Sequence, residues 1–216
     1  RRGVHALVRI VTAEDPYRGT RQLVEGYGLG RVVPNTVLMG LLEKDDSVED
    51  YCATLAAIHE GRRNLVLFSE GDGRGFGAHR RIDVWWGGLH SNGGLMLLLA
   101  YLLRTAVRWR QARIHIHLMV EHEDAVEPAR ENLERIISEM RIDARADVIE
   151  AKGRTFPEVL AESSRKTDLL FLGMADPDEN FVDYYRTMRD RAATLPPTVH
   201  VLAAEDLEFG EVLLQD

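Results

Sequence analysis

The sequence predicts an α/β protein with a doubly wound, mostly parallel sheet. Apolar, β-rich runs alternate with helical patterns along the whole chain. Several of these runs are apolar at almost every position, which is typical of strands that are covered by helices on both faces. The regular strand–helix alternation therefore favours a parallel sheet between two layers of helices.

The first part of the chain predicts three strands and two helices. Gly28 and Gly30 end the first helix, and Asp45-Asp46-Ser47 offers a cap for the second. In chain order we expect a strand at Ala6–Val11, a helix at Tyr17–Tyr27, a strand at Thr36–Leu42, a helix at Val48–His59 and a strand at Asn64–Phe68.

A glycine-rich segment then interrupts the pattern. From Gly71 to Gly77 every second residue is glycine and no hydrophobic period survives, which indicates a loop or linker. We therefore divide the chain into a first unit at residues 1–70, a linker at 71–81 and a second unit at 82–216.

The second unit predicts five strands and four helices. Its strands are expected at Ile82–Trp86, Arg113–Val120, Ala146–Ala151, Asp168–Gly173 and Thr198–Ala203. Its helices are expected at Gly94–Trp109, Val126–Met140, Phe156–Arg165 and Asn180–Ala193.

The two units follow the same pattern. Thr36–Gly40 can be laid on Asp168–Gly173, and Asn64–Phe68 on Thr198–Leu202, with an acidic loop and a helix between the strands of each pair. An internal duplication whose first copy is truncated is the simplest account. Two unrelated α/β segments would also alternate in this way.

Composition excludes several classes of protein. There are 27 Lys and Arg residues against 35 Asp and Glu, giving a net charge of −8, whereas a nucleic-acid binder usually has a basic surplus. Cys52 is the only cysteine, so an internal disulfide framework and a Cys-rich zinc site are both excluded. The longest apolar run, Leu95–Leu103, is too short to cross a bilayer, and the N-terminus does not resemble a signal peptide.

One loop is a candidate anion site. It joins an expected strand to an expected helix, where backbone N–H groups can face a phosphate. It fits neither common glycine-rich phosphate motif, and a tight turn with Ser91 or Asn92 as N-cap is the favoured alternative. The candidate ligand-binding residues are Gly87, Gly88, Ser91, Asn92, Gly93 and Gly94.

The remaining polar residues give weaker signals. Asp83 lies inside an apolar strand and needs a partner, most simply a salt bridge. His115 and His117 share a strand face, but no third ligand is spaced to complete a metal site. No nucleophile is paired with a base, so we expect neither an enzyme, nor a cofactor, nor a metal. The arginines after Leu103 are expected on solvated faces, with contact to an anionic membrane surface as a secondary reading.

Three segments, Gly28–Gly40, Ile82–Leu103 and Thr167–Gly173, carry motifs in an order and spacing that together resemble the cytosolic C-terminal domain of cation–chloride cotransporters. Gly28–Gly40, with Pro34-Asn35-Thr36, is similar to the family's G…PNT-V-G segment. Ile82–Trp86 followed by Asn92–Leu103 resembles its IDVWW…DGGL segment, and Thr167–Gly173 its TDL-LLG strand. The residues before Gly93 and the alanine at position 100 depart from the animal pattern and resemble a prokaryotic relative of amino-acid-permease type.

The resemblance implies a symporter's cytosolic domain that dimerises and follows a membrane part of the amino acid–polyamine–organocation type. It also implies two repeats similar to universal stress proteins, some of which bind ATP. The matching loops here, Leu41–Asp46 and Met174–Glu179, are acidic and lack the glycine-rich stretch that holds the triphosphate.

The sequence therefore predicts a regulatory and dimerisation domain at the cytoplasmic face of the membrane. Its expected partners are its own transmembrane domain and a second copy. A universal-stress-type module that senses a small ligand or nucleotide is the alternative, and an enzyme on a Rossmann-like scaffold is a third.

Overall fold

The computed structural model describes residues 8–26, 34–42, 44–87 and 90–205. Within them seven strands form one sheet in the order β1-β2-β7-β6-β3-β4-β5. The strands are β1 (Thr36–Gly40), β2 (Asn64–Ser69), β3 (Arg81–Trp85), β4 (Arg113–Val120), β5 (Ala144–Glu150), β6 (Leu169–Gly173) and β7 (Thr198–Leu202). The helices are α1 (Pro16–Gly26), α2 (Val48–Glu60), α3 (His90–Thr105), α4 (Val126–Glu139), α5 (Phe156–Ser163) and α6 (Phe181–Ala192).

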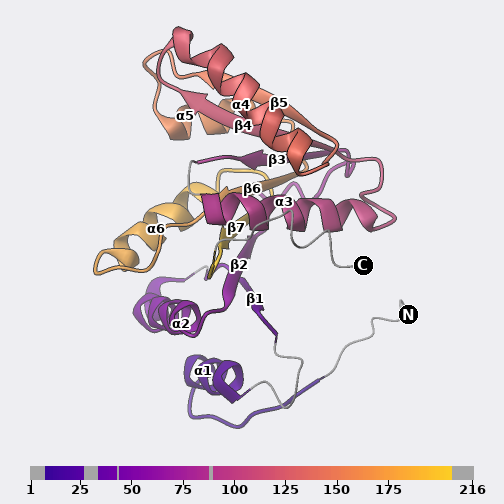
Figure 1. Ribbon diagram of the computed structural model, residues 1–216. Coiled ribbons are helices and arrows are strands. Elements are labelled where there is room, and N and C mark those ends of the chain that lie inside the picture. Colours follow the sequence, from indigo (N-terminus) through magenta and orange to yellow (C-terminus); the bar gives the residue numbers. More distant parts are fainter. Residues whose placement is uncertain (1–7, 27–33, 43, 88–89, 206–216) are drawn as a thin grey trace.

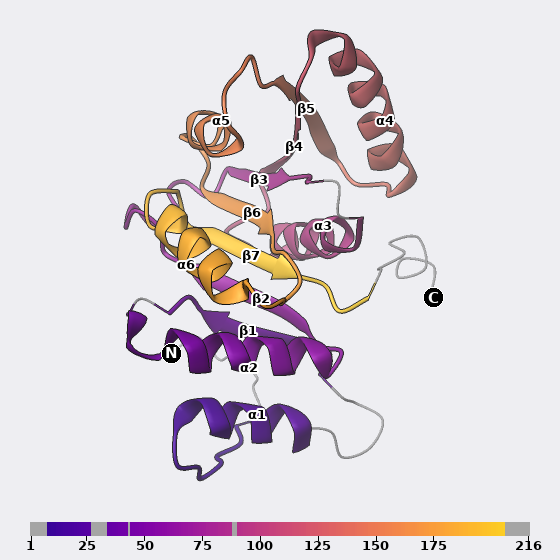
Figure 2. The same cartoon turned by 90° about the vertical axis from the view of Figure 1, so that its left-hand side faces the viewer.

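Helices cover both faces of the sheet (Figure 1, Figure 2). Helices α3 and α4 lie on one face, whereas α2, α5 and α6 lie on the other. Helix α1 packs on the outside of α2, where Arg21 donates a hydrogen bond of 3.2 Å to the Thr54 hydroxyl. The expected α/β class with helices on both faces is therefore confirmed.

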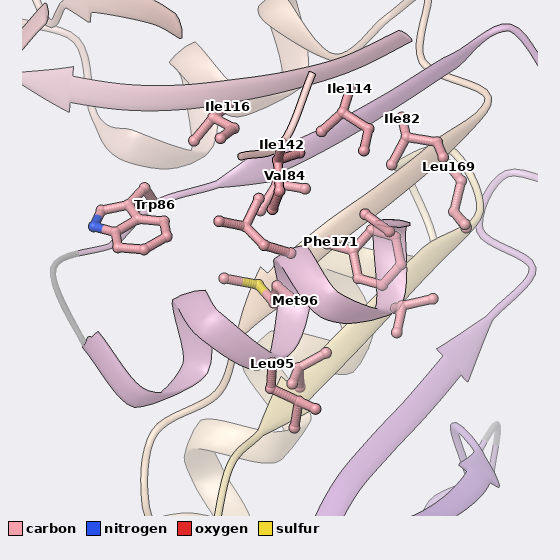
Figure 3. Packing of buried hydrophobic residues seen from close by; sticks show 14 of the residues in the cluster. Ile82, Val84, Trp86, Leu95, Met96, Ile114, Ile116, Ile142, Leu169 and Phe171 are labelled. Carbon is pink, nitrogen blue, oxygen red and sulfur yellow. The ribbon is translucent and has the colours of Figure 1, made fainter. Parts of the chain in front are cut away.

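Alternate residues of each central strand enter different cores. Val84 and Phe171 point toward α3, where Figure 3 shows Met96 and Leu95 packed near them. Trp85 and Leu172 point to the opposite face, toward α5. Because both faces are buried, nearly every position of these strands is apolar, which is why the sequence pattern predicted them well.

One strand pair in the sheet is antiparallel. β2 and β7 run in opposite directions, with Leu65 opposite Leu202 and Phe68 opposite Val199. The other pairs, β1–β2, β7–β6, β6–β3, β3–β4 and β4–β5, are parallel. The sheet is mixed because two parallel blocks meet at this pair.

The strand expected at Ala6–Val11 is wrong for its described residues, 8–11, which form no strand. Val8 and Ile10 are 86% and 89% exposed. A β-rich sequence becomes a strand only where neighbouring strands and a core can cover it, and this segment has neither. Ala6 and the glycines at 28 and 30 lie outside the described residues.

Most boundaries differ from expectation by one or two residues, and the starts of α3 and α2 differ in more important ways. Helix α3 begins at His90 and ends at Thr105, four residues earlier at each end than expected, so Asn92 lies within its first turn. Asp45–Ser47 forms a short 3-10 turn before α2, and Ser47 makes no side-chain capping bond. Tertiary contacts of Asn92, described below, account for the earlier start of α3.

Two buried tyrosines, Tyr51 on α2 and Tyr185 on α6, connect the two parallel blocks of the sheet, β1–β2 and the other five strands. The rings of Tyr51 and Tyr185 lie 5.4 Å apart. Tyr51 donates a 2.7 Å hydrogen bond to the Gly40 carbonyl, and the Tyr185 hydroxyl accepts one of 2.8 Å from Leu42 N–H. Burial raises the pKa of Tyr185 to about 12, so its hydroxyl stays neutral at all ordinary pH values.

We predict that Tyr185→Phe lowers the free energy of unfolding by about 1 kcal/mol, because the Leu42 N–H loses its partner. Urea denaturation followed by circular dichroism measures this change. The control is Tyr101→Phe: Tyr101 is 40% exposed and makes no hydrogen bond within the described residues. Equal stability of Y185F and wild type would show that this bond does not hold the two parts together.

Candidate functional site

The residues of the candidate glycine loop have separate structural positions. Gly87 is exposed after β3, and Gly93 and Gly94 are buried in the first turn of α3. Gly88 and the side chain of Ser91 lie outside what the structure describes. The six residues thus span a strand end and a helix start.

The Asn92 side chain links three segments of the chain through hydrogen bonds. Its side-chain amide donates a 2.8 Å hydrogen bond to the Met174 carbonyl and accepts one of 2.8 Å from Ala203 N–H. The side chain is almost fully buried. It therefore holds α3 against the chain that follows β6 and β7, and it is not the N-cap that the sequence suggested.

Gly93 is required by a close contact. A Cβ atom at this position would lie 2.6 Å from the ring of Trp86, closer than side chains approach in proteins. This glycine therefore seats α3 against the end of β3. That packing role needs no bound phosphate.

A cavity of about 240 Å³ lies beside this loop, on the α5 and α6 face of the sheet. It opens at the carboxyl ends of β3 and β6, between which the order of the strands reverses. Open α/β sheets usually bind ligands at such a switch point. Its walls come from β3, α3, α5, β6 with the loop after it, α6 and β7. The lining residues are Trp85, Gly87, Asn92, Met96, Phe156, Leu172, Gly173, Met174, Ala175, Tyr184, Thr187, Met188, Arg191 and His200.

His200 is the unusual member of this wall. It lies in the middle of β7, is only 2% exposed, and its Nδ1 has no hydrogen-bond partner among the described residues. Burial, with a smaller contribution from the charge of Arg191, lowers the pKa of His200 to about 3. The imidazole is therefore neutral, and an unpaired polar atom of this kind costs about 1–3 kcal/mol unless something binds it.

A buried polar network lies next to the cavity, on β3. Asp83 is fully buried and pairs with Arg81 at 2.7 Å, as the sequence suggested, and accepts a hydrogen bond from Thr167. Burial alone would raise the pKa of Asp83, but the neighbouring His117 and Arg81 outweigh it and lower the pKa. Because each acceptor oxygen has a partner, the network can stabilise the strand without a ligand.

The two strand histidines have separate partners. His115 pairs with Asp147 at 2.7 Å, and the ring of His117 stacks on Trp85 at 5.0 Å. Among the residues that the structure describes, no group of three or more His, Cys, Asp or Glu side chains could hold a metal ion. Cys52 is buried in α2, and burial raises the pKa of its thiol to about 11.

A larger hollow of about 540 Å³ lies at the carboxyl ends of β1 and β2. The cationic side chain in its lining, Arg189, already pairs with Asp45 at 2.8 Å and with Asp190 at 3.0 Å. Hydrogen bonding to Arg189 in turn lowers the pKa of Asp45. Since these charges satisfy one another, the smaller cavity at His200 is the better candidate for a ligand site.

We predict that acidification lowers the free energy of unfolding less in His200→Leu than in wild type. The folded-state pKa is about 3 and the unfolded value about 6.5, so the stability due to neutral His200 is complete above pH 6.5 and falls as pH decreases toward 3. Between about pH 7.5 and about pH 5 the variant should lose about 2 kcal/mol less than wild type. Urea titrations at both pH values, with exposed His122→Leu as control, measure the difference. The same loss in H200L as in wild type would contradict it.

None of the helices in the described part of the chain is long and apolar enough to cross a membrane. The model of solute carrier family 12 matches residues 63–153, which run from the start of β2 to the turn after β5. The chain is also similar to a solved structure described as the cytoplasmic domain of a prokaryotic cation chloride cotransporter. The TM-score is 0.67 at 21% identity, over 93% of this chain and 74% of that chain.

These findings confirm the resemblance noted in the sequence. Residues 63–153 carry the sequence pattern of solute carrier family 12, on a chain that has the fold of the cytoplasmic domain of a prokaryotic cation chloride cotransporter.

Proposed function

We propose that this chain is the cytoplasmic regulatory and dimerisation domain of a membrane secondary transporter of the cation–chloride cotransporter type. The observation that carries the proposal is the family match over residues 63–153, which include β3, the loop at Gly87–Gly94 and α3. The shared fold extends over both parts of the sheet. On this proposal the domain works without catalysis, at the cytoplasmic face of the membrane, against its own transmembrane part.

The gene offers the direct test of this assignment. The reading frame that encodes this chain is expected to encode a run of transmembrane segments ahead of it. If the frame instead encodes a short soluble protein, the transporter assignment fails and the sensing module described below takes its place.

We further propose that the sheet consists of two universal-stress-type units, at residues 1–70 and 82–216, joined by a linker at 71–81. The pairing of β2 with β7 supports this. When Asn64–Phe68 is laid on Thr198–Leu202, the pair Leu65–Leu202 exchanges with the pair Val199–Phe68, as a two-fold axis between two copies requires. Helices α2 and α6 then occupy equivalent places on the same face.

Hydrogen bonds between the linker and the second unit also support this division. The Asp168 carboxylate accepts hydrogen bonds from the backbone N–H groups of Ala78, Arg80 and Arg81. Asp72 N–H donates one of 2.8 Å to the Leu195 carbonyl. A single carboxylate thus fixes the point at which the chain enters β3.

An apolar groove beside α3 supports the proposed dimer. On the α3 face, β1 and the end of β2 are not covered by a described helix, and two adjoining hollows of about 410 and 330 Å³ lie there. Phe68, Val199 and Leu103 line them, and Leu38 and Leu102 at the margins are 70% and 51% exposed. An apolar surface of this kind is typical of a protein contact, and we assign it to a second copy of this chain.

We predict a homodimer that buries more than roughly 1,000 Å² and that Leu102→Glu dissociates, because the charge would be buried in the contact. Sedimentation at micromolar concentrations measures the mass. Ser138→Glu, which adds the same charge on the exposed side of α4, should remain dimeric. A wild-type monomer at high micromolar concentration, or an intact L102E dimer, would count against the groove as the contact.

A small-ligand or nucleotide-sensing module of universal-stress type is the alternative function. The cavity at the switch point between β3 and β6 favours it. The loop that follows, Asp176–Glu179, is acidic and exposed at Asp176, and it would repel a triphosphate.

We therefore predict weak or absent binding of ATP. Calorimetry with ATP and magnesium tests this, and the heat should show no saturation at micromolar concentrations. A dissociation constant at or below about 10 μM, equivalent to a binding free energy of about 7 kcal/mol, would contradict the prediction and favour the sensing module.

A further inference from the structure

We propose that the cavity at His200 binds a small organic monoanion with an apolar body, of the short-chain or aromatic carboxylate class. The inference rests on the cavity itself and is independent of the transporter assignment. It is carried by the composition of the walls, by the polar groups left without partners, and by the size and charge of the entrance.

The walls are mostly apolar and come from six elements. Trp85 and Phe156 meet edge to face, with ring centroids 5.3 Å apart. Met96 from α3 and Met188 from α6 are nearly fully buried and line the same space. Flexible methionines beside aromatic rings suit a compact apolar group such as a branched chain or a phenyl ring.

The polar groups of the wall are mainly hydrogen-bond donors. Arg191 provides a guanidinium for which no carboxylate partner lies within the described part of the chain. The Tyr184 hydroxyl accepts a 3.0 Å bond from Ala175 N–H, which leaves its own proton free to donate. Among the residues that the structure describes, no acidic side chain lines the cavity. Such a set is complementary to an anion or to a strong acceptor.

His200 provides an independent reason for a ligand. Its Nδ1 is buried without a partner, and the ring forms part of the wall. A neutral imidazole offers one donor and one acceptor, so it can bind a carboxylate oxygen without adding charge. A ligand at this wall would lie against a ring whose Nδ1 has no partner among the described residues.

Size and charge narrow the class of ligand. A volume of about 240 Å³ is below the usual 300–1,000 Å³ of pockets for drug-sized ligands, and a nucleotide would not fit inside. The acidic residues from Asp176 onward follow Ala175 at the wall, and they penalise a polyphosphate more than a single carboxylate. The walls and the entrance together favour a compact monoanion.

The test is a titration of the full 216-residue protein with benzoate, followed by calorimetry and by tryptophan fluorescence, to which Trp85 contributes. Benzamide has the same shape without the charge, and isobutyrate replaces the ring by a branched chain. We expect saturable benzoate binding with a dissociation constant below about 1 mM, and benzamide binding at least about tenfold weaker. Arg191→Met should weaken benzoate at least about tenfold and leave benzamide unchanged, whereas Arg186→Met on the same helix, outside the cavity, should leave both unchanged.

His200→Leu provides a second variant, with folding checked by circular dichroism, and should also weaken benzoate. The proposal is overturned if neither carboxylate saturates the folded protein below about 10 mM. It is also overturned if R191M and H200L both bind benzoate as wild type does, or if ATP displaces benzoate at micromolar concentration. The transporter assignment is unaffected by any of these results, because it depends on the reading frame.

Discussion

The antiparallel pairing of β2 with β7 is the contact on which the rest of the structure depends. It joins a block of two parallel strands to a block of five, so that a single sheet continues from β1 to β5. It also sets α2 and α6 side by side, because equivalent helices of the two blocks fall on the same face. The tyrosine pair and the Asp45–Arg189 ion pair then lie across the junction. Loss of the pairing would expose two strand edges and a core that neither block could cover alone.

The same arrangement produces two different surfaces. At the carboxyl ends of β3 and β6, six elements close around the cavity at His200, since β3 is followed by α3 on one face of the sheet and β6 by α6 on the other. On the other face α3 covers β6, β7 and the first part of β2 but does not extend over β1, so Leu38 and Leu102 remain exposed. On our two proposals, one face binds a small ligand and the other contacts a second copy of the chain. The cavity and the apolar groove both arise because helices cover some parts of the sheet and leave others uncovered.

Sequence reasoning predicted the central strands well and the rest less well, for physical reasons. β3, β6 and β7 are buried on both faces, so their apolar runs are unambiguous. The segment at residues 8–11 has the same kind of sequence but no neighbour to pair with, which local composition does not show. Asn92 looks like a helix cap in the sequence because its partners at Met174 and Ala203 are far away along the chain. His200 gave one signal, a single polar residue inside an apolar strand, but the cavity beside it depends on residues from six elements.

Helix α6 connects the ligand cavity to the junction between the blocks. Tyr184, Thr187, Met188 and Arg191 line the cavity, whereas Tyr185 and Arg189 on another side of the helix contact Leu42 and Asp45. The cavity residues and the contact residues alternate along α6 within three turns. A shift of α6 toward an occupied cavity would therefore also move its contacts with the block that contains β1 and β2. Coupling between two sites requires an element that both of them bias, and α6 meets that geometric condition. A ligand held by Arg191 would therefore act on the junction through one rigid helix, without a change in the strands.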